Sequence, residues 1–515
     1  MPLSSYPIDY QQVSHFSALF NAYIQSNPLL TPFISAFPSW DGFKAQMAEK
    51  GISFSPTQRH LLQQRLTSQM EPIGLTNVQQ ENLAKLTDSG TFSVSCGHQL
   101  SLAGGPMYMV FKILTVIKLA DELKRQFPDH HFVPVHWLAT EDHDLEEILP
   151  LRFERKTHQF KVTGTGAVGR LSGNGLKQQM ESIPGFPAWM AKCYPDDENL
   201  TTATRNWLQK CFGEMGLLVI DGDDSLFKKA FNPLAIKELK EKWSEKDVLE
   251  QSQKLKDAGF DPSVHSRDLN LFYLTENDRQ RLTKKGDTIT TADENRSWQE
   301  DEAIAFFEEN PEALSPNVLL RPLYSQMLLP DLAFVGGPAE IAYWLQLKSS
   351  FETGKTPFPL LIPRFSGCYL DQTFTRRIPK AGIAHTALLK SGVEIRKALF
   401  FRQDTTPDLD TAFEKLQAWA NETDITLLPA IEAEKKRILK QTLHIQHKIR
   451  KATERRHTEQ NHHIQILLDE VQPGGGLQER KESWLTFVAQ NPGWIQQIYH
   501  AINPLDFRFQ LLAES

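Results

Sequence analysis

Three carboxylates and one imidazole occupy four consecutive positions, Glu141 to Asp144. Such crowding separates the proton affinities of neighbouring groups, which suits general acid–base catalysis. The same pattern is typical of a Mg²⁺ site, of an amine-binding site and of the acidic first turn of an ordinary helix. The four residues directly follow the apolar run 131–139, which predicts a strand. We therefore predict that Glu141, Asp142, His143 and Asp144 are catalytic.

A second group, Gly97, His98 and Gln99, follows a short β-prone run at 91–96. Glycine lets the backbone approach a ligand, and a helix that begins soon afterwards offers N–H groups to an anion. His98 and Gln99 are able to donate hydrogen bonds to a phosphate or a carboxylate. A tight turn with a capping histidine has the same sequence. No GxGxxG or GxxxxGK[ST] motif is present, so the usual dinucleotide and P-loop fingerprints are excluded.

A third group combines the glycine turn Gly336-Gly337 with Glu340 and Tyr343. Glu340 falls in the first turn of the predicted helix, where an acid is also a common capping residue. We predict that all four residues contact substrate, because this turn and the two described above share one arrangement of strand, turn and helix.

A fourth pair, Arg321 and Tyr324, lies shortly before the predicted strand at 332–335. Arginine and tyrosine together are able to clamp a carboxylate, although such residues more often cap a helix or pack on a surface. We include both among the substrate-binding residues.

The elements that must position these residues read as an α/β fold. A strand at 91–96, a helix at 107–126 and a strand at 131–139 form a βαβ unit. Such units are right-handed with parallel strands, so both carboxyl ends meet at one edge of the sheet, where α/β proteins bind ligands. Further strands are predicted at 216–221, 332–335 and 358–363.

The chain divides into three regions that differ in their predicted secondary structure. Residues 1–90 read as helices that pack on the core, and residues 91–385 as a discontinuous core with insertions near 151–215 and 240–314. Residues 386–515 read as a helical region. Within it, residues 430–468 lack proline and glycine. An apolar heptad pattern runs from Ile431 to Ala452 and then fails, and it predicts a coiled coil and a homodimer.

Composition excludes several classes of protein. The 515 residues include 56 Lys and Arg against 63 Asp and Glu, a net charge of −7, so we expect no nucleic-acid partner. The four cysteines form no CxxC motif, and no metal ligands are assigned. The sequence shows no signal peptide and no membrane span, and we expect a cytoplasmic protein.

Long motifs identify a family. The segments GHQLSLAGGPMYMVFKILTVIKLA and PVHWLATEDHDLEEI, together with GGGLQER at 474–480, resemble the bacillithiol synthase family, also called cysteine ligase BshC. The segments 265–276 and 315–347 resemble it as well, in the same order. The resemblance implies a Rossmann-like parallel-sheet core with connecting-peptide insertions, followed by a C-terminal coiled coil that dimerises.

The implied activity is that of a carbon–nitrogen ligase of enzyme class 6. In the last step of bacillithiol biosynthesis, the carboxyl group of L-cysteine is joined to the amine of glucosaminyl-malate. The resemblance also implies a bound nucleotide, ATP or ADP, near the coiled coil, which we map onto Gly475, Gly476 and Arg480. A Mg²⁺ requirement stays open.

Two other functions compete with the ligase. One is a nucleotide-binding coiled-coil scaffold without catalysis. The other is a Mg²⁺-dependent nucleotidyltransferase in which residues 141–144 hold the metal.

Overall fold

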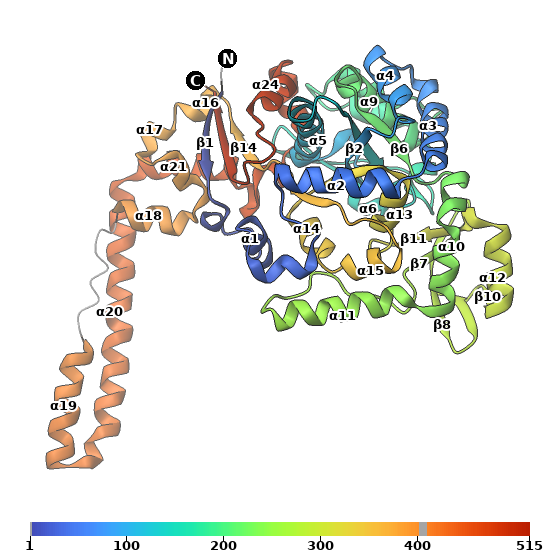
Figure 1. The fold of residues 1–515 in the computed structure, drawn as a ribbon. Coiled ribbons are helices and arrows are strands. Elements are labelled where there is room, and N and C mark those ends of the chain that lie inside the picture. Colours follow the sequence, from blue (N-terminus) through green and yellow to red (C-terminus); the bar gives the residue numbers. More distant parts are fainter. Residues whose placement is uncertain (1–2, 401–408, 515) are drawn as a thin grey trace. The chain divides into compact units, whose positions relative to one another are not determined.

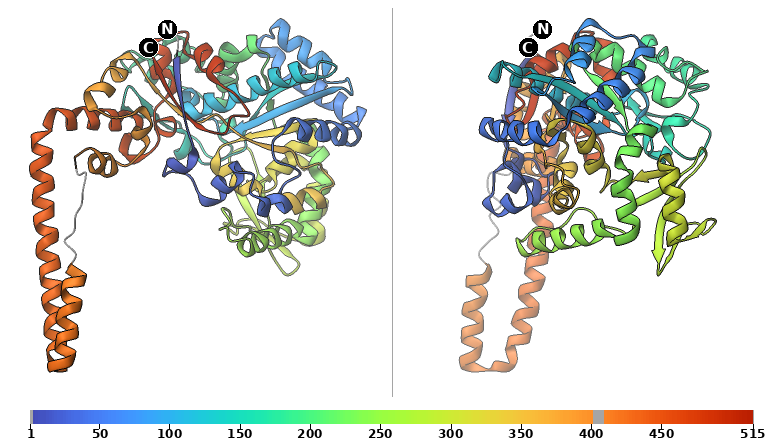
Figure 2. Two further views of the ribbon diagram at one scale, coloured as in Figure 1. Left: turned by 60° about the vertical axis from the view of Figure 1, so that its left-hand side comes forward. Right: turned by 45° about the vertical axis from the view of Figure 1, so that its right-hand side comes forward.

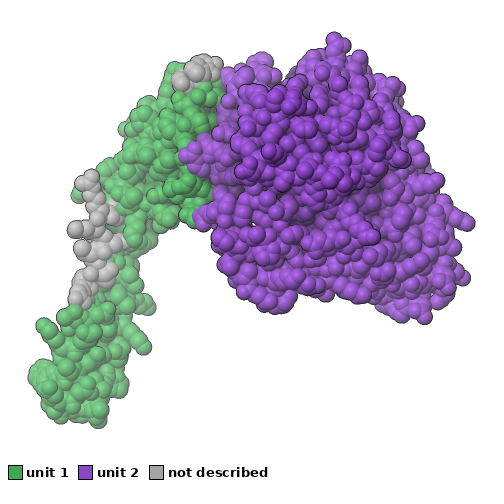
Figure 3. Space-filling view, in the orientation of Figure 1, with its two compact units in different colours: residues 1–14, 368–478, 511–515 green, residues 15–367, 479–510 purple. Residues whose placement is uncertain are grey.

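The computed structural model describes residues 3–400 and 409–514, apart from the side chain of Glu454. The chain forms two compact units, coloured separately in Figure 3. The larger unit comprises residues 15–367 and 479–510, and the smaller comprises residues 1–14, 368–478 and 511–515. The division at 367/368 lies before the expected end of the core at 385, and residues 479–510 return to the larger unit.

A five-stranded parallel sheet forms the core of the larger unit (Figure 1). Its order is β13-β12-β2-β3-β6, and each neighbouring pair is parallel. The strands are β2 (Thr91–His98), β3 (His131–Leu138), β6 (Leu218–Asp221), β12 (Asp331–Gly336) and β13 (Leu360–Pro363). The predicted βαβ unit is confirmed, because β2 and β3 pair in parallel over eight residues on either side of α5 (Met107–Gln126).

Helices surround this sheet in both views of Figure 2. Helix α5 packs against β2 and β3 with an apolar face that is fully buried along most of its length. Two helices from the N-terminal region also contact the sheet: α2 (Trp40–Ser53) meets β12 and β13, and α3 (Pro56–Met70) meets β6. Both begin at a serine that caps the first turn, which fixes where each helix starts.

The chain changes direction in the sheet between β2 and β12. From β2 it continues to β3 on one side, whereas β12 continues through α14 (Pro338–Trp344) to β13 on the other side. In open α/β sheets, such a switch point leaves a crevice at the carboxyl ends of the strands. The fold therefore brings the turn after β2 and the turn after β12 to one place.

The second insertion adds an antiparallel sheet of order β10-β9-β8-β7-β11. Its strands are β7 (Leu271–Leu274), β8 (Arg279–Lys285), β9 (Thr288–Thr291), β10 (Ser297–Gln299) and β11 (Leu314–Pro316). The first insertion contains a hairpin of β4 (Pro150–Phe153) and β5 (Lys156–Gln159). Helix α13 (Arg321–Leu328) follows β11 and leads to β12.

The smaller unit is mostly helical. Helices α19 (Leu409–Thr423) and α20 (Leu428–Arg456) contact each other along an antiparallel hairpin, and α21 (Thr458–Val471) follows. The predicted heptad residues 431–452 all lie in α20, and the stretch 430–468 without proline or glycine is divided into two helices at His457. No helix in the described residues combines the length and the apolar content that crossing a membrane requires.

A buried ion pair holds the returning segment 479–510 to the sheet. The Arg364 guanidinium, directly after β13, donates to both carboxylate oxygens of Glu479 at 2.7 and 3.0 Å. Glu479 also accepts from the backbone N–H of Gly367 at 2.9 Å, and both side chains are at most 2% exposed. Removal of one partner would leave a buried charge without compensation.

We expect Glu479→Gln to lower the free energy of unfolding by about 3 kcal/mol, because the amide leaves the Arg364 charge unbalanced. Urea denaturation followed by tryptophan fluorescence measures this change. Glu250 provides a matched control, since its pair with Lys254 is about half exposed and Glu250→Gln should change stability by less than about 0.5 kcal/mol. Equal effects of the two substitutions would contradict the assignment.

Candidate functional site

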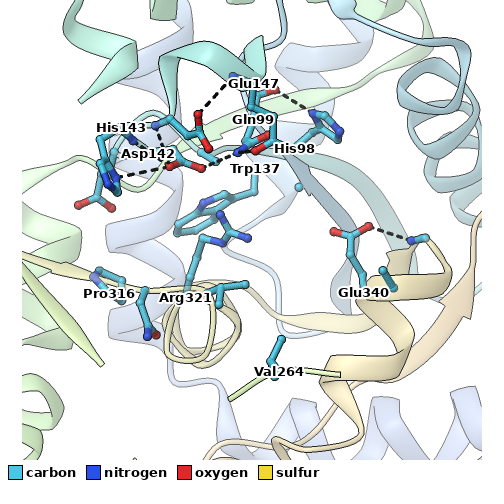
Figure 4. Close-up of a pocket in the computed structure, with 18 of the residues that line it drawn as sticks. His98, Gln99, Trp137, Asp142, His143, Glu147, Val264, Pro316, Arg321 and Glu340 are labelled. Carbon is cyan, nitrogen blue, oxygen red and sulfur yellow. Dashed lines mark hydrogen bonds and ion pairs between the residues drawn. The ribbon is translucent and has the colours of Figure 1, made fainter. Parts of the chain in front are cut away.

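A cavity of about 1030 Å³ opens at the carboxyl edge of the parallel sheet. Side chains from the turns after β2, β3 and β12 line it, together with residues of the second insertion and of α13 (Figure 4). Of the predicted site residues, the following line this cavity: Gly97, His98, Gln99, Glu141, Asp142, His143, Asp144, Arg321, Gly337, Glu340 and Arg480. The sheet topology thus brings together motifs that are more than 200 residues apart.

Lys112 joins the two turns at the switch point. Its ammonium donates to the carbonyl of Gly97 at 3.0 Å and to Glu340 Oε2 at 2.5 Å. Burial alone would raise the pKa of Glu340, but the Lys112 charge and the N–H of Gly337 hold this pKa below its ordinary value. Glu340 is therefore an anion fixed at the cavity wall.

The His98 imidazole is neutral, and one of its nitrogens donates a hydrogen bond while the other accepts one. Its Nδ1 lies 2.9 Å from the Gln99 carbonyl, which only accepts, so Nδ1 carries the proton. Nε2 then accepts from the Tyr108 hydroxyl at 2.9 Å. Burial and the nearby Lys112 charge lower the pKa of His98 to about 4. The imidazole therefore fixes the Tyr108 ring, and at neutral pH it adds no charge to the cavity.

Gln99 connects the first turn to the acidic cluster. Its amide donates to Asp142 Oδ2 and to Glu147 Oε2, both at 2.8 Å. Burial acts to raise the pKa of Asp142, but the Gln99 hydrogen bond and the charges of Arg279 and Arg321 lower it below its ordinary value. Asp142 is therefore an anion that faces the cavity, as Figure 4 shows.

The carboxylates of the acidic cluster, Glu141, Asp142 and Asp144, each have a different partner. The Glu141 carboxylate forms an ion pair at 2.7 Å with Lys228, whose side chain is 2% exposed and which also pairs with Asp223 at 3.1 Å. Asp144 caps the short helix α6 (Leu145–Ile148) by accepting from the N–H of Glu147. The charge of Glu141 is thus already balanced, and Asp142 is the member that contacts Gln99.

His143 lies against a basic wall of the cavity. Arg279 Nη1 donates to His143 Nδ1 at 3.0 Å, and a guanidinium has no acceptor. Nδ1 is therefore unprotonated, and Nε2 carries the hydrogen of the neutral ring. In this arrangement His143 is a hydrogen-bond donor toward a ligand. The guanidinium carbon of Arg279 lies 3.8 Å from the centroid of the Phe272 ring, and its Nη2 donates a hydrogen bond to the Pro316 carbonyl.

Two of the predicted substrate-contact residues, Tyr324 and Gly336, do not line the main cavity. Tyr324 is fully buried, and its hydroxyl donates to the carbonyl of Gly222 at 2.7 Å. Its ring packs edge-on against Trp137 at 5.4 Å, so Tyr324 supports the cavity wall from behind. Gly336 ends β12 and packs between Phe334 and Glu340, without lining the cavity. Tyr343 lies instead at a smaller side cavity.

The residues predicted to bind a nucleotide are separated by the unit division. Gly475 and Gly476 belong to the smaller unit, whereas Arg480 lines the cavity of the larger one. The N–H of Gly475 donates to Gln472 and that of Gly476 to Pro473, at 3.0 and 3.3 Å. These two N–H groups are therefore used within the turn, and the nucleotide site at Gly475, Gly476 and Arg480 stays a prediction. We assign no chemical step to a nucleotide at this loop.

The carboxylates at 141–144 do not converge on a common point. Within residues 3–400 and 409–514, no group of three or more His, Cys, Asp and Glu side chains is arranged to hold a metal ion. The cluster instead divides between Lys228, Gln99 and a helix cap, as described above. This geometry gives the nucleotidyltransferase alternative no support.

Several cavity residues lay outside the sequence prediction. They are Tyr108, Lys112, Glu147, Arg267, Arg279, Arg281 and Arg364. The sequence could have indicated Lys112, because this charged residue interrupts the apolar face of a helix that is otherwise buried. No sequence pattern indicated the arginines of the insertion, since their position depends on how the antiparallel sheet packs on the core.

The fold defines a class of protein: a parallel α/β protein with an inserted antiparallel sheet and a mostly helical C-terminal unit. Its large cavity lies at the switch point of the parallel sheet. Comparison of the sequence with protein-family models identifies the family. Residues 1–365 match "Bacillithiol biosynthesis BshC, N-terminal Rossmann-like domain", and residues 368–514 match the C-terminal coiled-coil domain of the same family. The chain belongs to the BshC family of bacillithiol biosynthesis.

Curated relatives match over nearly the whole chain. A protein of Cytophaga hutchinsonii is 34% identical over 513 residues and covers 98% of both chains. One from Flavobacterium psychrophilum is 34% identical, again over 98% of both chains, and one from Christiangramia forsetii is 32% identical with the same coverage. Each carries the name "Putative cysteine ligase BshC".

The lowered pKa of His98 predicts a pH-dependent stability. Between pH 6.5 and about 4, the unfolded chain binds a proton on this imidazole that the folded protein does not, so stability falls as the pH falls. Lowering the pH from 7 to 4.5 should reduce the free energy of unfolding of His98→Gln by about 2 kcal/mol less than that of the wild-type protein. Urea denaturation at the two pH values measures it.

The exposed His60 serves as the control, and His60→Gln should leave the pH dependence as in the wild type. An unchanged pH dependence in His98→Gln would show that the His98 ring is accessible to protons in the folded state.

Proposed function

We propose that the protein joins the carboxyl group of L-cysteine to the amine of glucosaminyl-malate, the final step of bacillithiol biosynthesis. Membership of the BshC family and the printed names of the relatives support a cysteine ligase. The observation that carries the proposal is the charge distribution of the cavity, which has an anionic side and a cationic side.

Glucosaminyl-malate has complementary charges. Its amine is a cation when protonated, and its malate group supplies two carboxylates. Asp142 and Glu147, both bonded to Gln99, form the anionic side. Arg279 and Arg281 of β8 form the cationic side that faces the malate carboxylates. Arginine is well suited to the second task, since its planar fork matches a carboxylate.

The geometry assigns different tasks to the members of the acidic cluster. Asp142, with its lowered pKa, is a strong partner for the substrate amine and a weak proton acceptor. His143 is set to donate from Nε2, because Arg279 occupies Nδ1. Glu141 acts through Lys228, which makes it a positioning residue. An amide does not form readily from a free carboxylate in water, so the cysteine carboxyl must be activated.

A product assay by mass spectrometry tests this function. The protein is mixed with glucosaminyl-malate, cysteine and Mg²⁺, with and without ATP. We expect cysteinyl-glucosaminyl-malate, and its dependence on ATP identifies the source of activation. Absence of the product in both mixtures, with folded protein, would overturn the ligase and favour the scaffold alternative.

Asp142→Asn preserves the shape of the side chain and removes the charge. We expect the KM for glucosaminyl-malate to rise about 10- to 100-fold, because a hydrogen bond to a charged group contributes about 1.5–3 kcal/mol. The KM for cysteine should stay within about twofold. The exposed Asp129 gives the control substitution Asp129→Asn, which should change neither constant. A rise in both KM values would contradict a specific contact with the amine.

We also propose a homodimer through the helical hairpin. Its helices expose large apolar side chains to solvent, which soluble surfaces rarely gather. These are Leu416, Trp419, Leu439, Leu443, Ile445 and Ile449, with exposed fractions from 41 to 67%. A second copy of the hairpin offers the matching surface, as in a coiled coil.

Light scattering should give about twice the chain mass of 58.7 kDa at micromolar concentration. The double substitution Ile445→Glu and Ile449→Glu places charges on the apolar surface and should return the mass to that of a single chain. Lys448→Glu, on the same helix, is the control and should stay dimeric. A monomeric wild-type protein would refute the dimer.

A further inference from the structure

A small side cavity of about 30 Å³ opens from the wall of the main cavity. The two spaces share wall residues that include Gly97, His98, Trp137, Arg321 and Glu340. A space of this size exceeds the roughly 10–15 Å³ that one water molecule requires. It therefore has room for one heavy atom or two of a ligand bound in the main cavity.

The inner walls of the side cavity are mostly apolar, and their one buried side-chain donor without a hydrogen-bond partner among the described residues is the indole N–H of Trp344. Phe334 and Trp344 stack with ring centroids 4.2 Å apart, which fixes one wall. Cys96 contacts His136 through its sulfur at 3.3 Å, and Ser325 donates its hydroxyl to the Pro322 carbonyl at 2.8 Å. A weakly polar, polarisable group such as a thiol suits this environment, because sulfur packs favourably against aromatic rings.

Opposite charges flank the entrance. The Glu340 carboxylate is fixed by Lys112 and by the N–H of Gly337, both through Oε2. A carboxylate accepts about four hydrogen bonds, so Glu340 is able to accept from a further ammonium group. The Arg321 guanidinium is the complementary partner for a carboxylate. Together they match the two charged groups of a free α-amino acid.

We propose that the side cavity binds the side chain of the substrate cysteine, with the α-ammonium on Glu340 and the carboxylate on Arg321. The proposal rests on the ligase function and adds the location and selectivity of the amino-acid site. Valine and leucine exceed the cavity, alanine leaves it empty, and serine replaces the thiol with a more strongly hydrated hydroxyl whose desolvation at mostly apolar walls is costly. Differences of one such group change binding about 10- to 200-fold.

Isothermal titration of the full-length protein with cysteine, alanine, serine and valine, under a phosphine reductant, tests the proposal. We expect cysteine to bind at least tenfold more tightly than the other three. Ser325→Val fills the side cavity and should weaken cysteine binding at least tenfold, while glucosaminyl-malate binds as before. Equal binding of cysteine and valine to the wild type, or absence of cysteine binding, would overturn it.

Two further variants complete the test. Ser350→Val is the matched control, because Ser350 is also a buried helical serine and lies outside both cavities. Ser325→Gly enlarges the cavity and should improve valine binding at least fivefold, which a merely destabilised protein would not show. Unaltered cysteine affinity in Ser325→Val would contradict the proposal.

Binding and turnover separate this site from the proposed reaction. Selective cysteine binding without any amide product would refute the ligase and leave the cysteine site in place. Formation of the product with an unchanged KM for cysteine in Ser325→Val would leave the ligase and refute the cysteine site.

Discussion

The contact of Lys112 with Gly97 and Glu340 is the interaction on which the site depends. One buried ammonium joins the end of β2 to the first turn of α14, which follows β12. From these two neighbouring strands the chain proceeds in opposite directions. A buried charge is costly unless it is paired, so this lysine requires Glu340 to be ionised and in place. The same carboxylate then becomes available at the wall of the cavity.

The charge pattern of the cavity comes from different parts of the chain. The parallel sheet supplies Gln99, Asp142 and Glu340 from the ends of its strands, and the inserted antiparallel sheet supplies Arg279 and Arg281. A sheet edge alone would present mostly acids and backbone groups. In the proposed function, these cations of the insertion bind the two carboxylates of the malate group.

Much of the fold could be predicted from the sequence, because it follows from local patterns. Helix α5 has the predicted bounds, since its apolar face and its flanking proline and glycine residues are local signals. The site was predicted only in part. The pairing of Glu141 with Lys228 and the burial of Tyr324 depend on contacts between residues about 90 to 100 positions apart, which no local pattern records. The predicted strand ends indicated where the cavity lies, whereas the partner of each charged side chain could be identified only from the structure.

A crystal structure with glucosaminyl-malate and cysteine bound tests the central claim most directly. We expect both molecules in the cavity at the switch point, with the sugar amine near Asp142, the malate carboxylates near Arg279 and Arg281, and the amino acid between Glu340 and Arg321. Substrates bound elsewhere on the protein, with this cavity empty, would contradict it.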